Sequence, residues 1–320
     1  MTLELALART RVDPRVEEAE VYARLIAMAA VGAEEAIGMQ VVGGLVNLVA
    51  REMLKICTPP KAMQDIIRWL NEKTPFRVDT YNPPGGLVRK EDGEAFYLIA
   101  RECPVRQILY FEDLPYGRSL CRIMCTCLEK LVTSALGGRY RVMLDRPGPN
   151  ACLLRVRVLS GPAPPNDLIV VSRKPSREEY IEQLMKAYSA MIKGISRALY
   201  LTLGGNVAMS YRAGKQYGRR VGAHILAEGY EPENIEEAID IMNAGLKNIL
   251  KTRLDSGYLV IEWSRFDKIV EKEGLQHPEF IKRLVQGFVA GILETLTGMK
   301  IDLRSTSEPN RYKLMVRSDA

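Results

Sequence analysis

The stretch PEFIKRLVQGFVAGILETLTG, residues 278–298, decides the fold of the C-terminal half of the chain. Its apolar residues recur at helical spacing, and the glycine at its end favours a helix terminus, so it predicts a helix that ends on Gly298. Two short segments rich in alternating apolar residues follow at 301–306 and 312–318 and predict a pair of strands. A helix that leads into a strand pair is therefore the first element of the predicted architecture.

The same pattern occurs once more, earlier in the chain. A shift of 160 without a gap places residues 97–157 on residues 257–317. The pairs matched in this way include Glu102 with Glu262, Leu136 with Leu296, Gly138 with Gly298, Pro149 with Pro309, Asn150 with Asn310 and Arg157 with Arg317. Upstream, a shift of 172 places 32–54 on 204–226, so the first copy carries extra residues, which fall near 82–93 and predict an exposed hairpin or loop. The period is much longer than that of solenoid repeats and indicates two duplicated domains.

Each copy is expected to contain the same elements in the same order. The first copy predicts helices at 13–31, up to 56 and at 61–73, a strand at 94–103, a helix at 120–138, and strands at 139–145 and 151–159. The second predicts helices at 177–202, 207–227 and 233–252, a strand at 257–263, the helix at 278–297 and the final strand pair. The expected domains are 1–159 and 177–320, joined by a Pro-rich linker at 160–176 that includes a short strand-like segment, LIVVS.

Composition supports two ordinary globular cores. The chain has 320 residues, of which 47% are hydrophobic and 26% charged. Its longest apolar stretch, 25–50, is interrupted by Glu34, Glu35, Gln40 and Asn47 and does not predict a membrane span. No secretory signal is visible at the N-terminus, and six cysteines without regular spacing are typical of reduced thiols, so we expect a cytoplasmic protein. A net charge of +6 permits an anionic partner without requiring one.

The glycine-bearing helix and the strand pair after it resemble the 4-vinyl reductase domain family, also called hydrocarbon-binding proteins, which is related to subunits of TRAPP tethering complexes. The resemblance is clearest over 280–316, where Gly287, Phe288, Gly291 and Gly298 match, and ECPV at 102–105 is similar to the family's mid-domain strand. It implies an α+β fold with two tandem domains, each a small antiparallel sheet covered by helices. It also implies space for an apolar ligand between sheet and helices. From the duplication, we expect the two domains to dock as an internal pseudo-dimer.

This resemblance implies a non-enzymatic carrier or sensor of a small hydrophobic ligand. The residues expected to bind that ligand are Tyr211, Tyr258, Trp263, Phe280, Leu284, Phe288 and Gly291. The alternative is an interaction scaffold of the TRAPP-like type, whose apolar helix faces receive a partner protein or a second copy of the chain. A third reading is an anion or nucleic-acid binder, although the sequence does not favour nucleic acid as a partner.

The third reading depends on the helix predicted at 207–227. Arg212, Lys215 and Arg219 share one face of it, and glycines spaced by four residues, Gly214, Gly218 and Gly222, line much of the other. We interpret the glycines as a close helix contact and the basic residues as a solvated face. The first copy has Gln40, Gly43 and Asn47 at the basic positions, so any anion site would belong to the second copy alone.

The cysteines are possible ligands of a metal ion. The resemblance implies that metal-binding members use a helix cysteine, a glutamate and two cysteines of the strand pair. Cys121 matches the first position and Cys152 approximately the last, but the other ligands are missing. The second copy has Ile281, Val285 and Gly287 where the first has Cys121, Cys125 and Cys127. We therefore expect buried structural thiols, no metal site and no cofactor.

No catalytic residues are predicted. The chain has two histidines, His224 and His277, and neither is spaced with a nucleophile and a carboxylate as in a triad. We expect both to be surface or helix-cap residues. Glu102 and Glu262 recur beside a predicted strand, where they are either buried carboxylates or residues of the solvent face, and we favour the solvent face. No glycine-rich phosphate loop is present.

Overall fold

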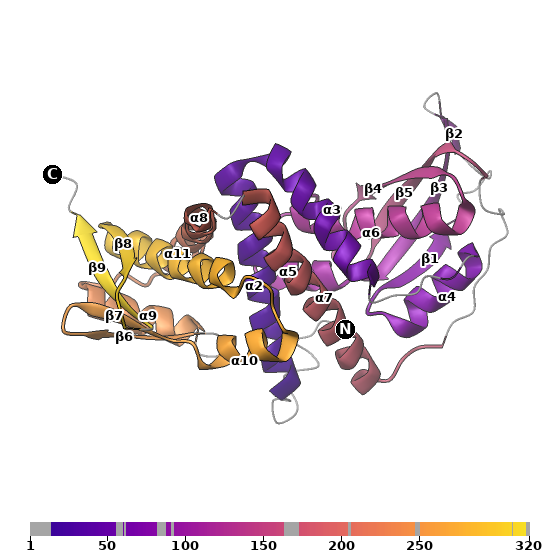
Figure 1. The fold of residues 1–320 in the computed structure, drawn as a ribbon. Helices are drawn as coiled ribbons and strands as arrows, with labels where there is room; N and C mark the ends of the chain where they lie inside the picture. The colour runs from indigo at the N-terminus through magenta and orange to yellow at the C-terminus, as the bar shows by residue number, and fades with distance from the viewer. Residues whose placement is uncertain are drawn as a thin grey trace. The chain divides into compact units, whose positions relative to one another are not determined.

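The computed structural model describes residues 14–55, 60, 62–81, 88–90, 93–162, 173–203, 206–246, 250–308 and 310–317. Within these residues the chain forms long helices and two separate antiparallel sheets (Figure 1). The α+β class predicted from the sequence is confirmed. Among the described helices, none has a stretch that is both long and apolar enough to cross a membrane.

The first copy of the repeat supplies the larger sheet. Its elements are α2 (Pro14–Ile37), α3 (Met39–Lys55), α4 (Met63–Lys73), β1 (Arg77–Tyr81), β2 (Val88–Lys90), β3 (Gly93–Glu102), α5 (Pro104–Phe111), α6 (Ser119–Leu136), β4 (Arg139–Arg146) and β5 (Cys152–Ser160). Gly38, with a φ of 88°, separates α2 from α3. Helices α4 and α6 pack on one face of the sheet, where Leu98, Leu154 and Val156 are buried.

The second copy supplies the smaller sheet. Its elements are α7 (Arg177–Leu203), α8 (Val207–Ala227), α9 (Ile235–Leu246), β6 (Lys251–Asp255), β7 (Tyr258–Glu262), α10 (Ser264–Glu273), α11 (Pro278–Thr297), β8 (Lys300–Ser305) and β9 (Arg311–Arg317). Helix α11 ends on Gly298 with a φ of 69°, as its counterpart α6 ends on Gly137 with a φ of 68°. Helices α9 and α11 pack on the face that buries Leu259, Ile261 and Ile301.

The two sheets have the same strand topology. Strand order is β1-β3-β5-β4 in the first and β6-β7-β9-β8 in the second, and all the pairings are antiparallel. The first sheet has one additional strand, β2, which pairs with the beginning of β3. It lies in the extra residues of the first copy and accounts for part of the predicted hairpin; residues 82–87 and 91–92 lie outside the described part of the chain.

One asparagine occupies the same position in both copies and joins a helix to the outer strand of each sheet. Asn71 of α4 donates to the Val78 carbonyl (2.9 Å) and accepts from the Val78 N–H (2.7 Å). Asn243 of α9 does the same with Thr252, at 2.7 and 2.9 Å. Because β1 and β6 are edge strands, these amides occupy backbone groups that would otherwise stay open to pairing.

The chain folds into two compact units that do not follow the order of the sequence. Residues 1–19 and 46–194 form the first unit, and residues 20–45 and 195–320 form the second. Most of α2, from the first repeat, therefore belongs to the second unit, and most of α7, from the second repeat, belongs to the first. This division differs from the expected boundaries 1–159, 160–176 and 177–320, which follow the repeat.

Three sequence-based predictions about elements are corrected. The helix predicted at 233–252 ends at Leu246, and the residues from Lys251 onward form β6. The ECPV segment is not a strand, because β3 ends at Glu102 and Pro104 begins helix α5. Helices α5 and α10 and strand β1 were not predicted at all. The strand-like segment LIVVS lies outside the described residues.

Candidate functional site

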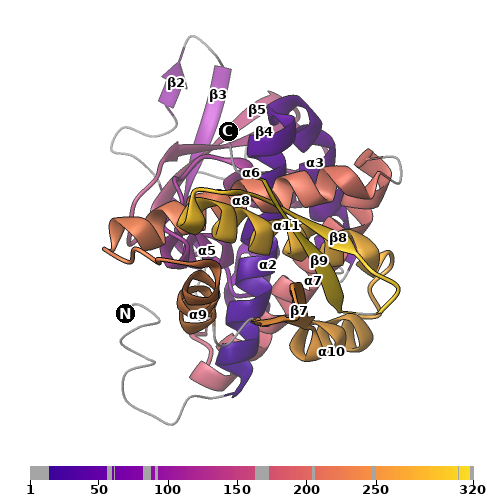
Figure 2. The same ribbon diagram turned by 90° about the vertical axis from the view of Figure 1, so that its left-hand side faces the viewer.

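Helices α8 and α11 lie in direct backbone contact along one side of the second unit (Figure 2). A Cβ added at Gly214 or Gly218 of α8 would overlap the carbonyl oxygens of Leu284 or Phe288 on α11. A Cβ at Gly287 or Gly291 would overlap the carbonyl oxygens of Tyr211 or Lys215 in the same way. The predicted close contact at the glycines of α8 is thus confirmed, and it is reciprocal.

Most of the residues expected to bind an apolar ligand lie inside this packed arrangement. Phe280, Leu284 and Phe288 are fully buried, and the Phe288 ring packs on Tyr217 with a centroid distance of 5.9 Å. Gly291 faces the backbone of α8, so it contributes no surface to a ligand.

The remaining expected ligand residues do not form one group. Tyr211 lies at the edge of the second sheet, where its hydroxyl accepts from the N–H of Leu303 at 3.0 Å. Trp263 is buried at the beginning of α10 beside Phe266, and its indole N–H has no partner among the described residues. Tyr258 lies on the opposite face of the sheet from the buried Leu259.

The basic residues of α8 have acidic partners. The Lys215 ammonium lies 2.8 Å from a Glu294 carboxylate oxygen and 2.9 Å from Asp302, and Arg219 Nε donates to Glu294 at 2.8 Å. Burial raises the pKa of Glu294, but hydrogen bonds from Lys215, the Ile301 N–H and Arg219 outweigh burial and leave that pKa below its ordinary value. Lys215 and Arg219 therefore bind helix α11 and strand β8. Arg212 is exposed.

The described cysteines are free thiols; Cys127 and Cys152 are buried, and Cys103, Cys121 and Cys125 are partly buried. Burial raises the pKa of Cys103 to about 12, that of Cys121 to about 11 and that of Cys125 to about 12. Cys121 Sγ accepts from the Gly117 N–H at 3.3 Å, and Cys152 lies near enough to raise its pKa further. Among the described residues, no three His, Cys, Asp or Glu side chains are grouped so that they could hold a metal.

The histidines and the repeated glutamates lie at the surface. His224 is exposed near the end of α8 and lies 3.3 Å from Glu228. His277 is the N-cap residue of α11 and stacks on Tyr200 with a centroid distance of 3.6 Å. Glu102 and Glu262 are about half exposed and lie beside Arg77 (3.6 Å) and Arg253 (3.7 Å), in agreement with the solvent-face interpretation.

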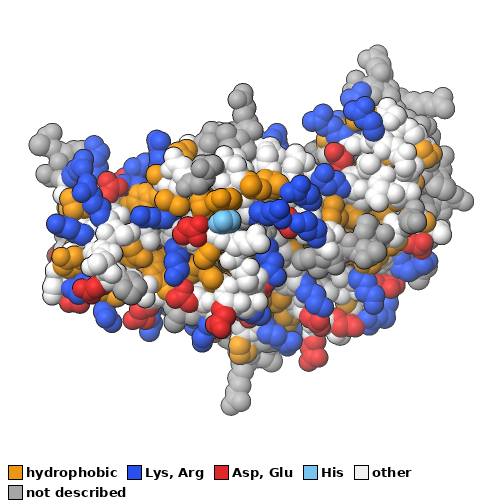
Figure 3. Space-filling model, in the orientation of Figure 1, with side chains coloured by type: hydrophobic (Ala, Val, Ile, Leu, Met, Phe, Trp, Pro, Cys, Tyr) orange, Lys and Arg blue, Asp and Glu red, His pale blue; other side chains and the backbone are white. Residues whose placement is uncertain are grey.

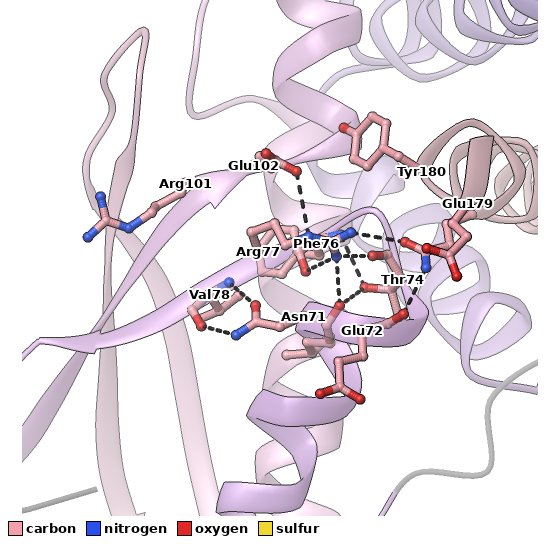
Figure 4. Close-up of polar contacts among 12 residues, drawn as sticks. Asn71, Glu72, Thr74, Phe76, Arg77, Val78, Arg101, Glu102, Glu179 and Tyr180 are labelled. Atoms are coloured by element: carbon pink, nitrogen blue, oxygen red, sulfur yellow. Dashed lines mark hydrogen bonds and ion pairs between the residues drawn. The ribbon is translucent and has the colours of Figure 1, made fainter. Parts of the chain in front are cut away.

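A polar network around Arg77 in the first unit was not predicted (Figure 4). The Arg77 guanidinium donates to the carbonyls of Leu70, Thr74 and Phe76 at the end of α4, and to the Gln183 side chain on α7 at 3.1 Å. Burial lowers the pKa of Arg77, and the nearby Glu102 carboxylate counteracts this effect. A guanidinium that occupies the last carbonyls of a helix stabilises the helix end, so we assign the network a structural role.

A basic surface on the second sheet was also missed by the sequence analysis. The side chains that alternate with the buried ones on β6, β7, β8 and β9 point away from α9 and α11. We call this surface the basic sheet face; it is formed by the basic residues Lys251, Arg253, Lys300, Arg304, Arg311, Lys313 and Arg317, the acidic residues Asp255, Glu262 and Asp302, and Tyr258, Val260 and Met315. Lys and Arg side chains are prominent where Figure 3 covers strands β8 and β9.

Cations oppose each other directly at two places on β8 and β9, where Lys300 is paired with Arg317 and Arg304 with Lys313. Arg304 of β8 is the cross-strand partner of Lys313 of β9, and both are exposed. The first sheet repeats the feature on the equivalent strands, where Arg141 of β4 opposes Arg157 of β5. Within the described residues, Arg304, Lys313, Arg141 and Arg157 form no ion pair. Like charges in directly opposed positions destabilise a sheet, so their presence in both copies needs an explanation other than stability.

Comparison with protein-family models, with curated proteins and with solved structures gives no match to this chain. The resemblance to the 4-vinyl reductase family stays a prediction.

Proposed function

We propose that this protein is a non-enzymatic binding protein that holds an anionic partner on the basic sheet face. The observation that supports the proposal is the exposed cation pair of Arg304 and Lys313, together with the opposed pair of Lys300 and Arg317 on the same strands and the pair of Arg141 and Arg157 on the equivalent strands of the first sheet. An anion between two such cations turns a repulsive contact into an attractive one. The proposal is a form of the third reading, with the anion on the second sheet in place of helix α8, and it includes a cytoplasmic location, which the free thiols favour.

A simpler explanation of these cations is protection of an edge strand, because charged residues on an edge oppose aggregation. This explanation accounts for Arg304 and Arg141, since β8 and β4 are edge strands. It does not account for Lys313 or Arg157, because β9 and β5 are internal. The internal cations therefore favour a binding role.

The carrier reading has less support from the geometry in the second unit. Its central residues, Phe280, Leu284 and Phe288, fill the core beside a helix pair closed by backbone contact. A retained apolar ligand in native mass spectrometry of the purified protein would be direct support for the carrier.

The proposal is tested by the salt concentration at which the protein elutes from an immobilised polyanion such as heparin. We expect Arg304→Glu/Lys313→Glu to elute at clearly lower salt than wild type. The control Arg212→Glu/Lys268→Glu reverses two exposed cations on α8 and α10 and changes the net charge equally. Equal losses in both variants would mean that only net charge matters and would overturn the proposal.

A further inference from the structure

We infer that the anionic partner of the basic sheet face is a single-stranded nucleic acid. The inference rests on the proposed function and adds the chemical class of the partner. It starts from a row of four cross-strand neighbours that runs across the whole sheet: Asp255 of β6, Tyr258 of β7, Lys313 of β9 and Arg304 of β8. Strands lie about 4.8 Å apart, so the row spans about 14 Å, the length of a short run of nucleotides.

The tyrosine in this row favours a nucleic acid over other anions. Tyr258 is half-buried on an internal strand, and the Arg311 guanidinium lies 4.6 Å from the centre of its ring. Single-stranded nucleic acids are bound by this combination, because bases stack on aromatic rings and guanidinium planes while phosphates meet the cations. An acidic peptide would bind to the cations and would not need an aromatic ring. A duplex keeps its base faces stacked inside and would leave the ring unused.

Unsatisfied hydrogen-bond donors occur on one internal strand of each sheet. The Nε–H groups of Arg311 on β9 and of Arg155 and Arg157 on β5 are buried and have no acceptor among the described residues. Strands β9 and β5 occupy equivalent positions in their sheets. The other nitrogens of the Arg311 guanidinium lie near Glu308 (3.1 Å) and Asp255 (3.7 Å), so the guanidinium is held beside the Tyr258 ring.

The second sheet offers the more accessible of the two surfaces. Arg253, Lys313 and Arg317 are exposed on it. On the corresponding face of the first sheet Tyr97, the cross-strand partner of Arg155, is buried. We therefore assign the binding of the nucleic acid to Tyr258 and its neighbours.

The test uses the full chain and fluorescence anisotropy with a labelled 20-nucleotide oligo-dT or oligo-U. Tyr258→Leu keeps an apolar side chain but removes the ring and is expected to weaken binding at least fivefold, whereas Tyr258→Phe stays within about twofold of wild type. Arg304→Ala/Lys313→Ala is expected to lower the steepness of log Kd against log salt by about 1.4, because each phosphate contact on a single strand contributes about 0.7. The control Arg212→Ala/Lys268→Ala is expected to retain the wild-type slope. Thermal unfolding of each variant verifies that it is folded.

Competition separates the inference from the proposed function. The competitors are duplex DNA, polyglutamate and phosphatidylserine vesicles. Preference for the single strand, together with sensitivity to the Tyr258 ring, supports the inference. Binding of polyglutamate or vesicles in preference to the single strand, or equal binding by Tyr258→Leu and Tyr258→Phe, would overturn the nucleic-acid inference and leave the proposed function intact. No binding of any of these anions would overturn both.

Discussion

At the residue scale, Gly291 shows how one hydrogen atom sets the distance between two helices. Its Cα faces the carbonyl of Lys215, and no side chain fits between them. Gly245 of α9 provides the opposite case, since it is exposed and a Cβ there would meet nothing within 4 Å. Alanine substitutions at these two glycines therefore distinguish the effect of helix packing on stability from the effect of helix propensity.

We predict that Gly291→Ala lowers the free energy of unfolding by about 1–3 kcal/mol through overpacking, although alanine is the better helix former. Gly245→Ala is expected to raise it by about 0.5–1 kcal/mol. Urea denaturation of both variants provides the measurement. An increase in stability for Gly291→Ala would show that α8 and α11 are not held at backbone contact.

The thiols give a prediction about pH. Burial raises the pKa of Cys103, Cys121 and Cys125 to about 12, 11 and 12, whereas an unfolded cysteine titrates near pH 8.5. Their stabilising effect is fully present below about pH 8.5 and is lost as the pH rises towards 11. We expect the stability of the wild type, measured under reducing conditions, to fall more steeply between pH 8 and 10 than that of a Cys103→Ala/Cys121→Ala/Cys125→Ala variant.

Labelling provides an independent check on the thiols. Because the thiolate is the reactive form, native protein at pH 8 should react with iodoacetamide at these positions only as fast as it opens. Rapid labelling of Cys121 in the folded protein would contradict the burial that raises its pKa.

At the element scale, the paired asparagines Asn71 and Asn243 hold the outer strands of the two sheets. Each amide satisfies one backbone donor and one acceptor on an edge strand. An unsatisfied buried backbone group costs about 1–3 kcal/mol, so the two asparagines stabilise the edges of both sheets.

We predict that Asn71→Ala and Asn243→Ala each lower the free energy of unfolding by about 2–4 kcal/mol, since each leaves two backbone groups unpaired. Asn71→Asp keeps the acceptor for the Val78 N–H but places a carboxylate oxygen against the Val78 carbonyl in a buried site, so at neutral pH it should destabilise the protein at least as much as alanine. The two alanine substitutions lie in different units, so their effects should add. A cost below about 0.5 kcal/mol for either would mean that the edge is satisfied by other means.

The sequence predicted most elements and the final strand pair of each copy, but not the order of the other strands. Helix α11 and strands β3, β4, β5, β8 and β9 were found because their periodicity is regular and occurs twice. The first two residues of β6, Lys251 and Thr252, were assigned to a helix because apolar residues recur at helical spacing up to Leu250, and only the tertiary pairing with β7 makes this segment a strand. The Asn71 and Asn243 match was visible in the 172-residue shift and was overlooked.

The candidate surfaces were harder to predict than the elements. Arg304 and Lys313 are nine positions apart in the sequence, and their opposition depends on the register of β8 and β9. The basic residues of α8 were visible as a stripe, but their partners Glu294 and Asp302 come from other elements. The sequence shows where charged residues lie along a helix, whereas the fold determines whether an opposite charge lies beside them.

At the scale of the whole molecule, each compact unit contains a helix from the other repeat. In the first unit, Gln183 and Tyr188 of α7 donate to the carbonyls of Glu72 (2.8 Å) and Pro104 (3.1 Å). In the second unit, Tyr22 of α2 donates to Glu273 at 2.6 Å, and Gly32 packs on the carbonyl of Ala213. The chain between the two repeats is therefore not needed to keep the repeats together.

We predict that the two fragments remain bound to each other after the chain is cut at a protease site introduced within 163–172. The two fragments should elute together in gel filtration without denaturant and separate in urea, because each one completes a core of the other. The uncut protein is the control. Fragments that separate in plain buffer would show that the exchanged helices contribute little to the units they belong to.

The placement of α2 also determines when the second unit can complete its folding during synthesis. Tyr22, Ile26 and Ala30 are fully buried in the second unit, yet they leave the ribosome long before α11 of that unit has been made. At about 5–20 residues per second, the interval is about 13–50 s. During this time the nascent chain displays an apolar helix whose core has not yet been made, and transiently exposed apolar surface of this kind is prone to aggregation and is what chaperones protect.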